Sequence, residues 1–179
     1  MAIRFGELKK YFSRVVRLSI CFHDGHYDNY ILPTDIPAGE YDDLYVYGVG
    51  TVDVEFPLDV YVEHNEKSKS GWYLGCGLEV VVQENARDIE RCNNEELTFG
   101  DLRNYLQCGR NFSIVTKEQW EEEIYEWRHE IPEKYNDMYV YGIGLEYNMD
   151  ALHEEKRINF IDSQLMKNLR IVLSETPRK

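Results

Sequence analysis

The sequence is poor in positive charge. Its 179 residues carry 20 Lys and Arg against 33 Asp and Glu, which gives a formal net charge of −13. Proteins that bind nucleic acid or an anionic membrane surface draw much of their affinity from cationic side chains, so the charge balance argues against both classes. The chain is nevertheless 13% aromatic. Disordered acidic chains are poor in aromatic residues, and we therefore expect this one to fold.

Signals for secretion, membrane insertion and disulfide bonding are also missing. No apolar run approaches the roughly 18 residues that a membrane span needs. The first ten residues, MAIRFGELKK, do not have the pattern of a signal peptide. The cysteines have irregular spacings and form no Cys-x-x-Cys pair; they are Cys21, Cys76, Cys92 and Cys108. We expect free thiols in a reducing cytoplasm.

Catalytic motifs are absent as well. No phosphate-binding loop, Gly-x-Ser-x-Gly, His-Glu-x-x-His or zinc-ribbon spacing occurs. His23 and His26 flank an Asp-Gly pair with Asp28 nearby, a combination that could hold a divalent metal. The Asp-Gly pair already explains the segment as a hairpin turn, so we predict no metal site, no cofactor and no catalytic residue.

What the sequence does contain is a tandem duplication with an offset of 94 residues. Segment 3–12 (IRFGELKKYF) matches 97–106 (LTFGDLRNYL), and segment 41–50 (YDDLYVYGVG) matches 135–144 (YNDMYVYGIG). We interpret residues 3–56 and 97–150 as two copies of one unit. A period of this length is too long for a solenoid and predicts two related lobes.

Each copy is predicted to open with a short helix and to continue as strands. Apolar residues at helical spacing favour helices at 5–12 and 99–106, with Thr98 as an N-cap. Alternating or β-branched segments predict strands at 17–22, 27–32, 44–50, 72–83, 111–116, 138–144 and 169–173. The segment Trp120–Glu130 suits a helix by periodicity, whereas the duplication favours a strand.

The third strand of each copy alternates bulky and small residues. In the first copy, one face is expected to carry Tyr45, Tyr47 and Val49, and the other to carry Gly48 and Gly50. Glycine weakens a strand unless something approaches its backbone closely, so we predict that each helix packs across the glycine face of its own sheet. The opposite face would be lined by tyrosines, either covered or exposed for binding: Tyr45, Tyr47, Tyr139 and Tyr141.

The expected fold class is α+β. Two related lobes would each consist of a short helix packed on an antiparallel sheet, with a pseudo-two-fold relation between them. The expected segments are a first repeat lobe at 1–56, a β-hairpin extension and linker at 57–96, a second repeat lobe at 97–150 and a C-terminal helix and strand at 151–179. Within the extensions, a strand is expected at 59–63 and helical character at 151–167.

The duplicated pattern F-G-[DE]-L … S-I … I-P … Y-x-D-x-Y-V-Y-G-[VI]-G resembles small acidic proteins carried by phages and mobile elements of gut Firmicutes. Proteins of that provenance include anti-CRISPR and antirestriction inhibitors, which bind a nuclease, often on its basic nucleic-acid groove. The resemblance implies a non-enzymatic inhibitor that mimics nucleic acid. Its partner would be a protein with a basic surface, such as a CRISPR effector or another nuclease.

Acidic side chains are expected to contact that partner. The chief candidates are Asp42, Asp43, Glu121, Glu122, Glu123, Glu126 and Asp137. We expect the run 121–123 to lie on a polar face that supports little packing. Two other classes of function remain open. A small-ligand-binding or enzyme domain would show a pocket with convergent polar groups. A structural or assembly protein would form an oligomer through a large apolar self-interface.

Overall fold

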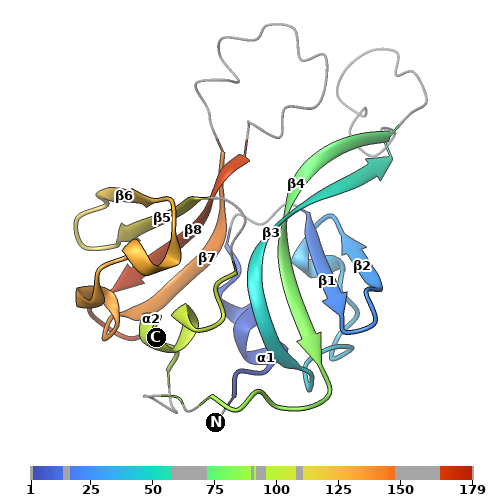
Figure 1. Ribbon diagram of the computed structural model, residues 1–179, viewed down its shortest axis with the longest axis horizontal. Helices are drawn as coiled ribbons and strands as arrows, with labels where there is room; N and C mark the ends of the chain where they lie inside the picture. The colour runs from blue at the N-terminus through green and yellow to red at the C-terminus, as the bar shows by residue number, and fades with distance from the viewer. Residues whose placement is uncertain are drawn as a thin grey trace, which may run out of the picture.

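The computed structural model describes residues 2–13, 17–57, 72–89, 91, 96–107, 111–147 and 166–178. It consists mostly of β-structure, arranged as two four-stranded mixed sheets (Figure 1). The first sheet has the order β2-β1-β4-β3 and lies on the right of the view, and the second has the order β6-β5-β8-β7. We call the parts of the chain that form these sheets the first and second repeat.

The strands agree well with the alternating segments of the sequence. In the first repeat they are β1 (Leu18–Phe22), β2 (Tyr27–Tyr30), β3 (Tyr45–Pro57) and β4 (Trp72–Gln83). In the second they are β5 (Asn111–Thr116), β6 (Glu122–Tyr125), β7 (Tyr139–Tyr147) and β8 (Met166–Ser174). The expected strand at 59–63 and most of the expected helical segment 151–167 lie outside the described residues.

The sheets are mixed, so the prediction of antiparallel sheets is wrong. β3 and β4 form an antiparallel hairpin whose second strand inserts between β3 and β1, and β4 consequently runs parallel to β1. β7 and β8 repeat this arrangement beside β5. An alternating pattern identifies a strand but not its neighbours, because both parallel and antiparallel partners use the same period of two residues.

The structural repeat continues beyond the segments that match in sequence. Leu18 is in register with Leu78 of β4, and Phe112 is in register with Leu169 of β8. Because Leu18 and Phe112 correspond at the 94-residue offset, Leu78 corresponds to Leu169 at an offset of 91. Each sheet therefore takes its fourth strand from the segment that follows the sequence repeat.

Short helical turns precede the first strand of each sheet. They are α1 (Phe5–Leu8), continued by the 3-10 turn η1 (Lys9–Tyr11), and α2 (Phe99–Arg103). Their phenylalanines and leucines are fully buried, which is why the helical spacing of these residues was informative. The predicted N-cap is confirmed, since Thr98 Oγ1 accepts a hydrogen bond from the Asp101 N–H at 3.3 Å.

A β-bulge changes the phase of both third strands. Val46 lies opposite Val82 and Gly48 lies opposite Val81, so Tyr47 is an extra residue in β3. Val46 and Val49 therefore both face the core, with no exposed surface, although simple alternation had placed them on opposite faces. The same shift occurs in β7 around Tyr141.

Candidate functional site

The two repeats are joined by the segments that follow their helical turns. The Ser13 N–H donates to the Ile143 carbonyl of β7 at 2.8 Å. In the other direction, the Gln107 N–H donates to the Val49 carbonyl of β3 at 2.9 Å, and the Val49 N–H donates to the Tyr105 carbonyl. Ser13 and Gln107 correspond at the 94-residue offset, as do Val49 and Ile143. The same positions thus make this contact twice, which is the pattern of a symmetric dimer interface.

The glycines of the third strands admit side chains of the opposite repeat. A Cβ atom added at Gly48 would lie 2.0 Å from Gln107 Nε2, and one added at Gly142 would lie 2.6 Å from Ser13 Oγ. The prediction that each helix packs across the glycine face of its own sheet is therefore wrong. The alternation of bulky residues and glycines indicates that another segment packs closely against the glycine face. It does not show which segment of the chain this is.

Two arginines that sequence analysis missed bind the carbonyls at the bulges. Arg87 Nη1 donates to the Tyr47 carbonyl at 3.0 Å and to the Asn104 carbonyl at 3.1 Å, so it links its own sheet to the other repeat. The corresponding contacts at the second bulge join Arg178 to the carbonyls of Tyr141 and Lys10. The arginines correspond at the 91-residue offset, which a search at 94 residues does not reveal.

A third arginine connects the acidic positions of the two helical turns. Arg91 lies between the repeats in the sequence, and its side chain is 4% exposed. Its Nη1 lies 2.6 Å from Glu7 Oε1 and its Nε lies 3.9 Å from Asp101 Oδ2. Glu7 and Asp101 are the same position of the repeat. One buried cation is therefore shared by two equivalent carboxylates.

The four candidate tyrosines are all half-buried: Tyr45, Tyr47, Tyr139 and Tyr141. The Arg4 guanidinium lies 5.2 Å from the ring centroid of Tyr45, and Lys117 Nζ lies 4.0 Å from that of Tyr141. These rings are thus used in intramolecular cation–π contacts. Contact between the tyrosines and a partner stays a prediction.

The candidate acids of the first repeat are paired within the molecule. Asp43 Oδ1 accepts from Arg4 Nη1 at 2.8 Å, and Asp42 pairs with Lys9. These pairs brace the loop before β3 against the start of the chain. Because each carboxylate is paired with a cation, it offers a partner protein less uncompensated negative charge than we expected from the sequence.

The run 121–123 is not a simple solvated face. Glu123 accepts hydrogen bonds from the hydroxyls of Tyr125 and Tyr135, the latter at 2.8 Å, and Glu122 accepts one from Ser113. The bonds from Tyr125 and Tyr135 hold the pKa of Glu123 below its usual value. All three glutamates are exposed, as expected, but two of them also accept hydrogen bonds within the second repeat.

The Glu123 cluster has a counterpart in the first repeat that the sequence alignment had concealed. There, the Tyr41 hydroxyl donates to Asp28 at 2.8 Å and lies 2.6 Å from the Tyr30 hydroxyl. Burial and these two partners raise the pKa of Tyr41. The strand registers make Asp28 equivalent to Glu123, at an offset of 95 residues. Both repeats thus fasten their edge strand to the following loop through two tyrosines and one carboxylate.

Three candidate acids of the second repeat have no cationic partner in the part of the chain that the structure describes. Glu121, Glu126 and Asp137 are exposed, and none forms an ion pair with another described residue. They accompany Glu133, which is also exposed and unpaired in the part of the chain that the structure describes. The uncompensated acidic charge of this repeat lies around β6 and the loop leading to β7.

Large apolar side chains are exposed in the same region. The relative exposures are 63% for Trp120, 57% for Ile124 and 46% for Trp127. The ambiguous segment Trp120–Glu130 contains the strand β6 and, after it, the 3-10 turn η4 (Arg128–Glu130), so the preference for a strand is confirmed for its central part. Its apolar residues have helical spacing, but they do not form one buried helix face. Ile124 is exposed on β6, and Trp120 and Trp127 are exposed on either side of the strand.

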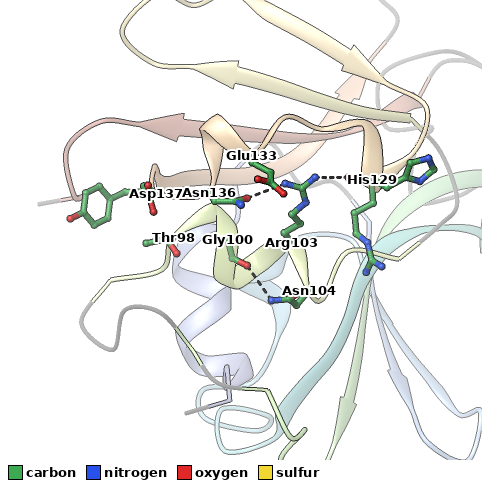
Figure 2. Close-up of a pocket in the computed structure, with 10 residues that line it drawn as sticks. Thr98, Gly100, Arg103, Asn104, His129, Glu133, Asn136 and Asp137 are labelled. Atoms are coloured by element: carbon green, nitrogen blue, oxygen red, sulfur yellow. Dashed lines mark hydrogen bonds between the residues drawn. The ribbon is translucent and has the colours of Figure 1, made fainter.

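A polar pocket of about 750 Å³ lies beside α2 (Figure 2). Arg103, which points into it, donates to Asn136 Oδ1 at 3.0 Å and to the carbonyls of Arg128 and Ile131. In the first repeat the equivalent pair, Lys9 and Asp42, forms the ion pair described above. Since the Arg103 guanidinium is committed to the loop, its evident role is to brace that loop.

The structure describes the side chains of both candidate histidines and of Cys21. His26 Nε2 lies 3.0 Å from Asp28 Oδ1. The part of the chain that the structure describes contains no group of three or more His, Cys, Asp or Glu side chains that could hold a metal ion. Cys21 is a buried free thiol. Cys92 and Cys108 lie outside the described residues, as does the side chain of Cys76.

Comparison with known proteins identifies no relative: no family model matches the chain, and neither the curated proteins nor the solved structures contain a significant match. Within the described residues, none of the helices has the length and apolar character needed to cross a membrane.

Proposed function

We propose that the protein is a non-enzymatic binding protein that blocks a basic, nucleic-acid-binding surface of a partner protein. The partner class is a bacterial defence nuclease, in the manner of anti-CRISPR inhibitors. The observation that carries the proposal is the set of exposed acids on the second repeat that form no ion pair with another described residue. They add to a net charge of −13 for the whole chain.

The mechanism is electrostatic substitution. Carboxylates would take the places of phosphates on the partner's Lys and Arg side chains, and the opposite charges of the two proteins would speed their encounter. Such binding weakens as salt screens the charges, since the screening length falls from about 10 Å at 0.1 M to about 3 Å at 1 M. DNA or guide RNA would compete for the same surface.

The proposal is tested with a panel of purified CRISPR effectors and restriction nucleases. The test variant reverses three unpaired acids, Glu121→Lys, Glu126→Lys and Asp137→Lys. A matched control reverses three exposed acids of the first repeat that have no ion pair among the described residues, Glu40→Lys, Glu84→Lys and Asp88→Lys. Both variants change the net charge equally, so a difference between them reports location and not total charge.

We expect one panel member to lose nuclease activity when the protein is added, with nucleic acid competing. The test variant should bind about tenfold more weakly, mainly through a slower on-rate, while the control stays near the parent. Complexes that are indifferent to salt, form together with bound nucleic acid and tolerate the test variant would contradict the proposal. Equal loss in both variants would contradict the assignment of the surface.

A further inference from the structure

β6 lies at the edge of the second sheet, and its outer side is open. The strand order places β5 on its inner side only. No backbone group of another described residue bonds to the outer side of residues 122–125. An exposed edge is a template for pairing with another chain, and proteins usually protect it with charged side chains.

Here the charged side chains of the edge are already engaged. Glu123 accepts from two tyrosines and Glu122 accepts from Ser113, as described above. Ile124 remains as the exposed side chain in the centre of β6, with Trp120 before the strand and Trp127 after it. The exposed apolar side chain of Ile124 therefore lies beside two glutamates that already have partners, and acids without an ion pair among the described residues flank the strand.

The first repeat shows that the fold does not need these apolar residues. In register, Asn29 of β2 occupies the position of Ile124, because Ser19 pairs with Asn29 and Ser113 pairs with Ile124. Leu32 occupies the position of Trp127, and both precede a 3-10 turn with the same carboxylate cap. Positions that serve the fold, such as the carboxylate shared by two tyrosines, are kept in both copies. The first copy also exposes apolar side chains at its edge, Tyr27 at 43% and Leu32 at 42%, but an apolar residue at the position of Ile124 occurs in the second copy alone.

The backbone of the turn also presents one of these residues outward. Trp120 has a positive φ of 57°, and its N–H donates to the Thr116 carbonyl at 2.7 Å. The left-handed region is unfavourable for a bulky side chain. Trp120 is 63% exposed in this conformation, so little of its apolar surface is buried to offset the cost.

We propose that the outer edge of β6 is the docking site for an extended, basic segment of the partner protein, which adds to the second sheet as a further strand. Backbone hydrogen bonds along the edge would supply affinity. Lys or Arg side chains of the added strand would meet Glu121 and Glu126, and its apolar side chains would cover Ile124 and the two tryptophans. This inference rests on the proposed function, because it names the surface and the kind of segment by which that partner binds.

The probe is a ten-residue peptide of alternating Lys and Val, compared with peptides of alternating Glu and Val and of Ser and Val. The protein variant is Ile124→Asn with Trp127→Leu, which gives the second repeat the residues of the first, where the same fold accepts them. Leu32→Asn, at an exposed apolar residue beside β2, is the matched control.

We expect the Lys/Val peptide to bind at least tenfold more tightly than the Glu/Val peptide. Amide resonances of 122–126 should shift, and the fluorescence of the tryptophans should change. The variant should lose at least tenfold in affinity and Leu32→Asn should lose none. Shifts located elsewhere, or equal binding of the acidic and basic peptides, would overturn the inference. So would a dimer of the parent protein that the variant abolishes, because the edge would then serve a second copy of this chain.

The two proposals fail in different ways. A nuclease complex that depends on salt and on Glu121, Glu126 and Asp137, but tolerates Ile124→Asn with Trp127→Leu, would overturn the edge-docking inference and leave the proposed function standing. Peptide binding at β6 without inhibition of any nuclease in the panel would contradict the proposed function and retain the docking site.

Discussion

At the scale of the residue, the third-strand glycines are required by close approach. Gly48 and Gly50 both face Gln107 of the other repeat, but at different distances: an added Cβ would lie 2.0 Å from Gln107 Nε2 at the first position and 3.4 Å from Gln107 Cβ at the second. The first distance is a collision that forces Gln107 to move, and the second is a tight but tolerable contact.

Gly48→Ala should therefore destabilise the protein by about 1–3 kcal/mol, the usual cost of overpacking, whereas Gly50→Ala should cost clearly less. Urea unfolding of both variants measures the difference. Adding Gln107→Ala to Gly48→Ala should recover most of the loss, which a double-mutant cycle reports as a coupling energy. Equal effects of the two alanines, or no recovery, would show that the glycines are kept for another reason.

The carboxylates also show that spacing in the sequence is a poor guide to which residues have equivalent roles. Asp28 and Glu123 do the same work, yet a one-residue insertion in the second hairpin moves them off the 94-residue offset. Glu121 and Glu123 are neighbours in a charge run, but one is free in solvent and the other accepts two tyrosine hydroxyls. Residues two apart share a face only where strand geometry holds, and Glu121 precedes β6.

At the scale of the element, the edge strand β6 is fixed to the loop before β7 by the cluster around Glu123. Tyr135→Phe keeps the buried ring and removes the hydroxyl that donates to Glu123, so it should cost about 1 kcal/mol at neutral pH. Tyr139→Phe is the control, because the Tyr139 hydroxyl has no hydrogen-bond partner among the described residues. Thermal or urea unfolding compares the two variants.

The pH dependence of this cluster follows from the direction of the pKa shift. The bonds from Tyr125 and Tyr135 lower the pKa of Glu123 in the folded state, so its contribution is fully present above the ordinary glutamate value of 4.5. That contribution is lost as the pH falls through the lowered pKa. The stability gap between the parent and Tyr135→Phe should therefore be constant from pH 7 to pH 5 and shrink below pH 4. A gap that widens in acid would contradict this reading.

At the scale of the whole molecule, the two repeats share one hydrophobic core, so we expect them to unfold together. The contacts between them come in corresponding pairs, and their buried apolar residues form one core. Arg91 is the exception to this pairing, since a single guanidinium serves Glu7 and Asp101 together. Removing a buried cation that two carboxylates share leaves charge uncompensated in both repeats at once.

Arg91→Ala should consequently destabilise the protein by about 3–5 kcal/mol, as for one partner removed from a buried ion pair. Far-UV circular dichroism and tryptophan fluorescence, measured against urea, should give coincident single transitions for the parent and the variant. Arg87→Ala, which removes contacts to backbone carbonyls but leaves the buried charge pair, should cost less. Separate transitions for the two probes would show that the repeats unfold independently.

The duplication, the positions of most strands and the cap at Thr98 followed from the sequence alone. These features depend on local side-chain periodicity and on identity between copies, which a single chain displays directly. Strand order, the bulges at Tyr47 and Tyr141, and the arginines that bind them were decided by the tertiary structure. They depend on backbone pairing between segments far apart in the chain, which no local pattern encodes. The same distinction holds for the candidate binding surface. The sequence shows that acids and tryptophans gather in segment 118–137. Only the tertiary structure shows that Asp42, Asp43 and Glu123 each form an ion pair within the molecule, and that Ile124 lies on an open edge.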